Sequence, residues 1–99
     1  MNSYFERVSS NLNHDDLAVL TYLNQNDASI KLKAMSKQEV IEESSKAGMT
    51  LSEAAIRKAL YRLEALMFIE IVPGSRNHKL MITDFGTSAL LSQLERIDS

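Results

Sequence analysis

Two capped helix starts, separated only by a short turn, constrain the fold of this chain more than any other feature. Ser36 and Glu39 form an S-x-x-E capping box, in which each side chain bonds the other residue's backbone N–H. Thr50 and Glu53 repeat the pattern, so a second helix is predicted to begin there. Gly48 lies between them, and glycine readily adopts the left-handed conformation that commonly ends a helix. The segment is therefore predicted to be a helix-turn-helix pair.

The hydrophobic period changes directly after the second of these helices. From Ile56 to Leu63 apolar residues recur every three to four positions, as on the buried face of a helix. Residues 68–72 are instead rich in β-branched and aromatic residues, and they end at the turn pair Pro73–Gly74. Residues 79–82 read as a returning strand. A β-hairpin is therefore predicted to follow the helix-turn-helix pair.

Three further helices and a short strand complete the predicted order of elements. Asn13 caps a helix with two aspartates in its first turn, where carboxylates suit the helix dipole. Thr83 caps a C-terminal helix, and Ser3 and Glu6 form a possible capping box for a short N-terminal helix. Residues 33–35 are expected to add an edge strand to the hairpin. The predicted helices span about residues 14–24, 37–47, 51–66 and 84–97, and the predicted strands span about residues 69–72 and 79–82.

This order predicts one mainly α-helical domain with a small β-hairpin, a winged helix-turn-helix. The chain has 99 residues, of which 44% are hydrophobic, and such a chain buries one core of ordinary size. The whole chain, 1–99, is assigned to this domain, with 1–12 as an arm or short helix and 83–99 as the C-terminal helix. There is no cysteine, which excludes disulfides and cysteine metal sites.

The sequence carries no signal of a membrane or an export pathway. Its first residues lack the apolar core of a signal peptide. Its longest apolar runs, such as residues 66–69, are too short to span a bilayer. A soluble, cytoplasmic protein with no membrane partner is therefore expected.

The charge of the chain is unevenly distributed. The net charge is −2, which by itself does not indicate a nucleic-acid partner. Residues 54–79, however, hold five basic residues against two acidic ones, and the remainder of the chain is net acidic. Because local basic surface sets contact with phosphates, this third of the chain is predicted to face double-stranded DNA.

The predicted helix Ser52–Leu66 is assigned as the recognition helix, since a helix fits the major groove of B-DNA. Its buried face leaves a set of outward or flanking residues: Ser52, Ala54, Ala55, Arg57, Lys58, Tyr61 and Arg62. Arg57 and Lys58 are expected to reach bases or phosphates, and Arg62 phosphate. The wing, residues 75–79, holds a second set: Ser75, Arg76, Asn77, His78 and Lys79. Arg76 is expected to contact the minor groove or the backbone.

Three segments resemble bacterial and archaeal winged-helix regulators of the MarR/PadR type. They are the runs at residues 56–64 and 68–74 and the Ile-Thr-x-x-Gly sequence that opens the last helix at residues 82–86. The resemblance covers roughly residues 15–94 and implies sequence-specific binding of duplex DNA by a homodimer that represses transcription. The chain departs from the family at Met67, where a glycine usually ends the recognition helix. It also lacks the long flanking helices with which MarR proteins dimerise and hold ligands, so no small-molecule ligand is evident.

An enzyme finds little support in this sequence. There is no Gly-rich phosphate loop and no nucleophile motif, and neither histidine has a partner at metal-ligand spacing. No catalytic residue, metal or cofactor is therefore predicted. The alternative comes from another class of protein: a winged helix that binds a protein partner without DNA, because fold does not fix function.

Apolar residues near both ends of the chain predict a homodimer. The last helix carries Leu90, Leu91, Leu94 and Ile97, and the first carries Tyr4, Phe5 and Val8. This apolar stripe is wider than one small core requires, so the interface is placed on the N- and C-terminal helices. The methionines at 35, 49, 67 and 81 are predicted to fill the core.

Overall fold

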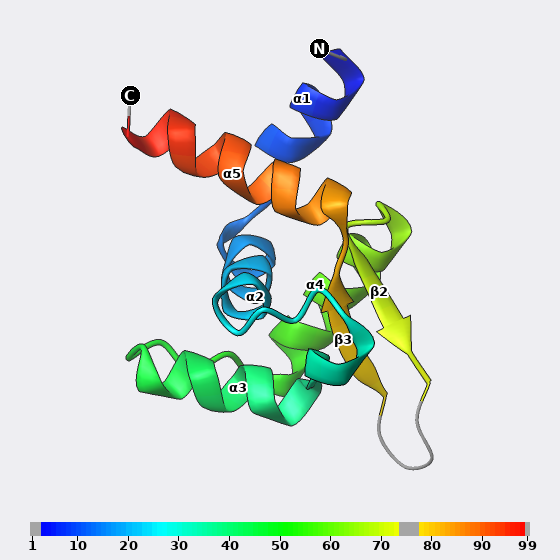
Figure 1. Cartoon of the computed structure of the whole chain (residues 1–99). Helices are drawn as coiled ribbons and strands as arrows, with labels where there is room; N and C mark the ends of the chain where they lie inside the picture. The colour runs from blue at the N-terminus through cyan, green and yellow to red at the C-terminus, as the bar shows by residue number, and fades with distance from the viewer. Residues whose placement is uncertain (1–2, 74–77, 99) are drawn as a thin grey trace.

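The computed structural model describes the backbone of residues 3–73 and 78–98 and the side chains of residues 7–73 and 78–95. Five α-helices, a 3₁₀ turn and three strands follow one another along the chain (Figure 1). They are α1 (Ser3–Ser10), α2 (His14–Gln25), the turn η1 (Lys31–Lys33), β1 (Met35–Ser36), α3 (Lys37–Lys46), α4 (Glu53–Ala65), β2 (Ile69–Val72), β3 (Lys79–Ile82) and α5 (Asp84–Asp98). Every predicted element is present, including the short N-terminal helix, but the edge strand lies at Met35–Ser36 and not at 33–35, because Lys33 belongs to the 3₁₀ turn.

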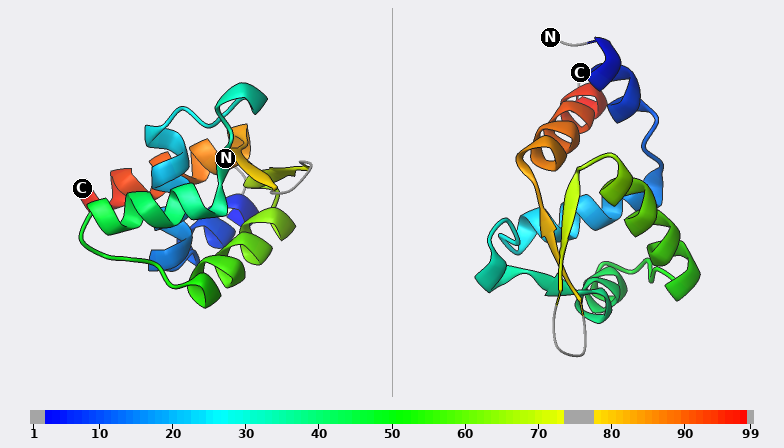
Figure 2. Two further views of the ribbon diagram at one scale, coloured as in Figure 1. Left: turned by 90° about the horizontal axis from the view of Figure 1, so that it is seen from below. Right: turned by 90° about the vertical axis from the view of Figure 1, so that its right-hand side faces the viewer.

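The α2 helix lies at the centre of the molecule and contacts α3, α4, α5 and β3. The sheet is antiparallel with strand order β1-β3-β2, so the central strand pairs with both neighbours. The α1 helix packs on α5 at one end of the molecule (Figure 1). The hairpin ends that lead into the wing lie beside α3 at the opposite end (Figure 2). This arrangement is the winged helix predicted from the sequence.

Side-chain caps fix the starts of α2 and α3 as predicted. Asn13 and Asp16 form a complete capping box at α2, with the Asn13 side chain accepting from the Asp16 backbone N–H at 2.9 Å. Ser36 and Glu39 form the corresponding box at α3, where the Ser36 backbone N–H donates to Glu39 at 2.9 Å. Each box satisfies two backbone donors that a helix terminus otherwise leaves without partners.

The prediction for the start of α4 was wrong in its capping residue. Ser52, not Thr50, caps this helix, and its side chain accepts from the Ala55 backbone N–H at 3.1 Å. The Thr50 hydroxyl instead lies 3.0 Å from the Ser45 hydroxyl in the turn. The sequence of the turn offers two hydroxyl residues two positions apart, and the packing of the turn against α3 selects the later one. Leu51, buried between them, donates its backbone N–H to the Ser44 side chain.

Three helices end with a residue in the left-handed conformation. Gly48 after α3 has φ of 86°, as predicted for a helix-ending glycine. Asp27 after α2 and Met67 after α4 have φ of 54° and 64°, which is unusual for residues with side chains. At α4 the Phe68 N–H bonds to the Leu63 carbonyl at 2.9 Å, the long hydrogen bond of a Schellman motif. The recognition helix therefore ends abruptly at Met67 instead of running on.

The core is formed by all the major elements except α1, whose Val8 packs against its edge. Its members are Val19, Leu20, Leu23, Ala28, Met35, Val40, Leu51, Ile56, Ala59, Leu60, Leu63, Phe68, Ile69, Leu80, Ile82, Ala89 and Leu90. The prediction that the methionines fill the core holds for Met35 but is wrong for Met49 and Met67, which are 74% and 66% exposed. Both follow helix ends, where the chain turns at the surface. Among the described helices, none is long and apolar enough to cross a membrane.

The start of α5 is tied to the end of α4 by a single threonine. The Thr83 hydroxyl donates to the Met67 carbonyl at 2.7 Å and accepts from the Gly86 N–H at 3.1 Å. The Thr83 N–H also donates to the Phe68 carbonyl at 3.0 Å. A Cβ at Gly86 would lie 2.1 Å from that same carbonyl oxygen, so only glycine permits this close approach. These contacts give a physical reason for the Thr-x-x-Gly sequence.

Candidate nucleic-acid interface

The α4 helix presents one buried and one exposed face, as its sequence predicts. Ile56 and Leu63 are fully buried and Leu60 nearly so, which fixes the rotation of the helix about its axis. On the other side the predicted contact residues Ser52, Ala54, Arg57, Lys58, Tyr61 and Arg62 are exposed, and Ala55 is half-buried. The core thus orients the predicted recognition surface towards solvent.

A groove of about 690 Å³ lies between the starts of α3 and α4 and the sheet. It is the place where the helix and the hairpin meet, since Arg57 and Tyr61 from α4 line it together with the wing residue His78. Its lining residues are Ser36, Lys37, Gln38, Glu53, Arg57, Leu60, Tyr61, Ile71, His78 and Leu80. The lining combines apolar side chains such as Leu60 and Leu80 with polar side chains and with charged side chains of both signs.

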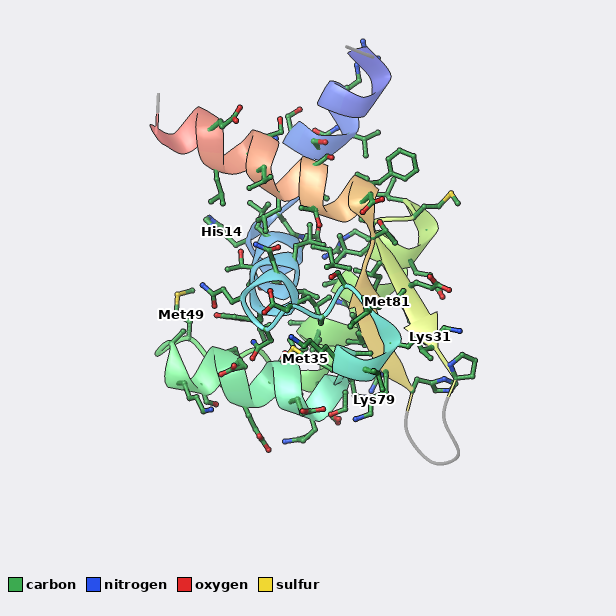
Figure 3. All side chains as sticks on the ribbon, in the orientation of Figure 1. His14, Lys31, Met35, Met49, Lys79 and Met81 are labelled. Atoms are coloured by element: carbon green, nitrogen blue, oxygen red, sulfur yellow. The ribbon has the colours of Figure 1, made fainter. Side chains whose placement is uncertain are left out.

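Two ion pairs cross this region and engage two of its cations. Lys37 Nζ lies 3.4 Å from Glu53 Oε1, which joins the first residues of α3 and α4. Lys79 Nζ lies 3.4 Å from Glu39 Oε1, which joins β3 to α3, and Figure 3 shows Lys79 beside the start of α3. A hydrogen bond from the Ser36 backbone is the main cause that lowers the pKa of Glu39, and Lys79 lowers it further.

Arg57 and Lys58 differ from these paired cations. Neither forms an ion pair with any residue of the part of the chain that the structure describes, and both side chains are exposed on α4. An exposed, uncompensated guanidinium or ammonium group is well placed to bind an anion from solvent. These two residues are therefore the cations of α4 that form no ion pair with another described residue.

Arg62 has an intramolecular partner that the sequence did not reveal. Its Nε and Nη2 atoms donate to Asp16 Oδ1 at 3.0 and 2.7 Å, an arrangement that joins α4 to α2. The Asp16 side chain is only 2% exposed, whereas that of Arg62 is 42% exposed. The hydrogen bonds that Arg62 donates to the Asp16 carboxylate raise the pKa of Arg62 above its ordinary value. Arg62 thus has a structural role, and its contact with phosphate stays a prediction.

The predicted wing residues divide between described and undescribed positions. Ser75, Arg76 and Asn77 lie outside the described residues, so their predicted contacts stay predictions. His78 and Lys79 are described, and both are exposed. His78 reaches the groove, whereas Lys79 is held by Glu39.

Sequence reasoning missed the contribution that the first residues of α3 and α4 make to this surface. Lys37, Gln38 and Glu53 line the groove, although none of them was predicted as a contact residue. The N-caps could have shown that Lys37 and Glu53 are the first residues of their helices, because each directly follows a capping serine. What the sequence could not give is that the starts of α3 and α4 lie side by side.

A curated protein and a solved structure, both named TubR, are similar to this chain over most of its length. The curated DNA-binding protein TubR of Priestia megaterium is 38% identical over 90 residues, which are 91% of this chain and 84% of the relative. The solved structure of TubR from Bacillus megaterium has a TM-score of 0.83 at 35% identity. That match covers 94% of this chain and 98% of the other.

Two further solved structures share the fold at lower identity. RosR of H. salinarum has a TM-score of 0.72 at 18% identity, covering 88% of this chain and 74% of the other. A PadR-like transcription factor from Bacteroides fragilis has a TM-score of 0.65 at 15% identity, covering 84% and 79%. The winged-helix fold is therefore confirmed, and the predicted resemblance to PadR regulators extends to the fold alone. No family model matches the sequence.

Proposed function

Because the chain belongs to the TubR family of DNA-binding proteins, we propose that it binds double-stranded DNA sequence-specifically through α4 and the wing. The observation that carries this proposal is the groove between α3, α4 and the hairpin. The groove brings Arg57 of α4 and His78 of the wing to one surface. A duplex seated there meets donors from both elements at once, as the winged-helix docking mode requires.

Arg57 and Lys58, the two cations of α4 that form no ion pair with a described residue, differ in whether they line the groove. Arg57 lines the groove, so we assign it to base edges, where an arginine binds guanine O6 and N7 with two hydrogen bonds. Lys58 is the next residue and does not line the groove, so we assign it to phosphate. Arg76, in the wing, remains our candidate for the minor groove or the adjacent backbone.

We further propose that the protein acts as a homodimer that represses transcription. The support is an apolar surface on α5, where Leu91 and Leu94 are 49% and 43% exposed. The α1 helix packs on the same helix. A two-fold dimer would present two copies of α4 to a pseudo-palindromic site. A repressor needs no more than this, because occupying a promoter excludes other proteins from it.

The test is a titration of labelled duplex at several salt concentrations with folded variants. Arg57→Ala is expected to weaken specific binding roughly tenfold. Lys58→Ala should weaken binding to all duplexes alike and reduce the slope of log affinity against log salt concentration by about one. Lys46→Ala is a matched control, since it removes an exposed charge at the far end of α3 from the groove. If the Arg57→Ala, Lys58→Ala, Arg76→Ala triple variant binds duplex as well as the parent, this surface is not the DNA site. A protein partner would then be the better assignment.

A further inference from the structure

Glu53 is an acidic residue that lines the groove of the proposed DNA-binding surface. It is the first residue of α4, and it lines the same groove as Arg57, one helical turn further on. Its side chain is 64% exposed. A residue at this end of a recognition helix lies where the helix enters the major groove, close to base edges. The side chain can therefore reach DNA only as an acceptor of hydrogen bonds.

A carboxylate at this position needs a reason, because it is repelled by DNA phosphates. A negative charge favours the start of a helix through the helix dipole, whereas Ser52 supplies the cap by accepting from the Ala55 N–H, and neither effect requires the carboxylate to line the groove. The major groove offers carboxylates a specific partner, the amino group at N4 of cytosine. Guanine and thymine present acceptors to the same region and would repel a carboxylate. Adenine presents its N6 amino group beside the N7 acceptor, so Glu53 has the chemistry to favour cytosine.

Lys37 holds this carboxylate from the neighbouring helix. Its Nζ atom lies 3.4 Å from Glu53 Oε1, and its side chain is 39% exposed, against 64% for Glu53. The pair restricts Glu53 to one side of the groove and offsets part of the repulsion by phosphate. Since one carboxylate oxygen faces Lys37, the other is left to accept from a base.

We propose that Glu53 determines specificity by reading a cytosine amino group, and that Lys37 is the positioning residue that holds its carboxylate. This inference rests on the proposed function, since it concerns the same surface. Together with Arg57, which suits guanine, Glu53 would read two neighbouring base pairs from successive turns of α4. The target site should then contain a cytosine contacted by Glu53 next to a guanine contacted by Arg57.

The experiment is selection of bound sites from a random duplex pool by the full-length parent, followed by titration of single-base variants of the recovered site. Glu53→Ala is expected to abolish a preference for cytosine of roughly tenfold at one position while the affinity for unrelated duplex rises. Glu53→Gln should shift the preference at that position towards adenine, which a glutamine amide binds with two hydrogen bonds. Lys37→Met should weaken the preference at the same position, and Lys37→Arg should restore it.

The control is Glu64→Gln, which removes an exposed carboxylate from the other end of α4 and should leave every base preference unchanged. The inference is overturned if Glu53→Ala tightens binding to all duplexes by one factor and leaves the preferences intact, because Glu53 would then act only by repulsion. A parent that binds no duplex would instead overturn the proposed function. Thermal unfolding of each variant confirms that it is folded before its preferences are compared.

Discussion

The buried carboxylate of Asp16 accepts hydrogen bonds from both Nε and Nη2 of Arg62, so α2 and α4 are joined by a two-point contact. The same carboxylate also accepts from the Asn13 N–H at 3.2 Å, as part of the cap of α2. One side chain thus fixes the start of the central helix and the position of the recognition helix. This relationship changes what a substitution of Arg62 is expected to do.

Arg62→Ala should lower the free energy of unfolding by about 2 kcal/mol, because it leaves the Asp16 carboxylate buried without its charged partner. This figure lies below the range for fully buried pairs since Arg62 is partly exposed to water. The double variant Asp16→Asn, Arg62→Ala should lose less free energy of unfolding than the two single variants lose in sum. Urea unfolding of the four proteins of this cycle measures the coupling. Additive effects would show that the contact contributes nothing to stability.

Gly86→Ala should destabilise the fold by about 3 kcal/mol or more, although alanine favours helices. The added Cβ would lie 2.1 Å from the Phe68 carbonyl oxygen, which is backbone and cannot move without shifting the hairpin. Gly48→Ala is the matched comparison: its Cβ meets nothing within 4 Å, but its φ of 86° is strained for alanine. That change should cost about 1 kcal/mol. The midpoint of thermal unfolding of Gly86→Ala should therefore lie well below that of Gly48→Ala. The reverse order would contradict the close approach of Gly86 to Phe68.

Met67→Gly should stabilise the protein by about 0.5–1 kcal/mol. The residue has φ of 64°, a conformation in which glycine carries no Cβ penalty, and its side chain is 66% exposed, so little packing is lost. Denaturant unfolding with an unchanged m-value would support this expectation. A loss of stability would mean that the exposed methionine makes contacts worth more than the strain it causes.

Stability should fall as the pH is lowered past the ordinary pKa of Glu39, which is near 4.5. The backbone hydrogen bond from Ser36 lowers the pKa of Glu39 in the folded protein, so its contribution is complete above 4.5 and is lost as the pH falls through the lower folded value. Glu39→Gln preserves an acceptor for the capping box but does not titrate. Unfolding measured from neutral pH downwards should therefore show a shallower acid decline in this variant. Identical declines would assign the acid sensitivity to other carboxylates.

Leu91→Glu, Leu94→Glu should convert the proposed dimer into a monomer that remains folded. Both side chains are about half exposed on α5, so charges there oppose burial against a second copy more than they disturb the core. Sedimentation of the parent and the variant gives the oligomeric state, and Leu32→Glu, which puts a charge on an exposed apolar residue of η1, serves as the control. A parent that sediments as a monomer at tens of micromolar would remove the dimer from the proposal.

Local signals in the sequence predicted most of the fold. The hairpin strands were placed at their observed bounds because Pro73 and the change of period mark them unambiguously. Gly48 ended its helix as expected. The prediction failed where local chemistry offered two equal choices, as with Thr50 and Ser52, or where an apolar residue such as Met49 lies at the surface. Packing, not composition, decides such cases.

The candidate site was less predictable because it depends on contacts between distant residues. The exposed face of α4 follows from its periodicity, so Arg57 and Lys58 were identified correctly as exposed. The partners of the charged residues do not follow from periodicity. Arg62 lies 46 positions from Asp16, and Lys79 lies 40 positions from Glu39. Lys37 and Glu53 belong to different helices, so their meeting also depends on the tertiary fold.

Thr83 joins the end of α4 to the start of α5 in a fixed corner. Its hydroxyl bonds to backbone atoms of Met67 and Gly86, and its N–H donates to the Phe68 carbonyl. The two helices consequently cannot pivot about a flexible joint. In a dimer held through α5, the separation between the two copies of α4 would be set by the angle of this corner rather than by a linker. The spacing of half-sites that such a dimer accepts would then be narrow, and loosening the corner with Thr83→Ala would broaden it.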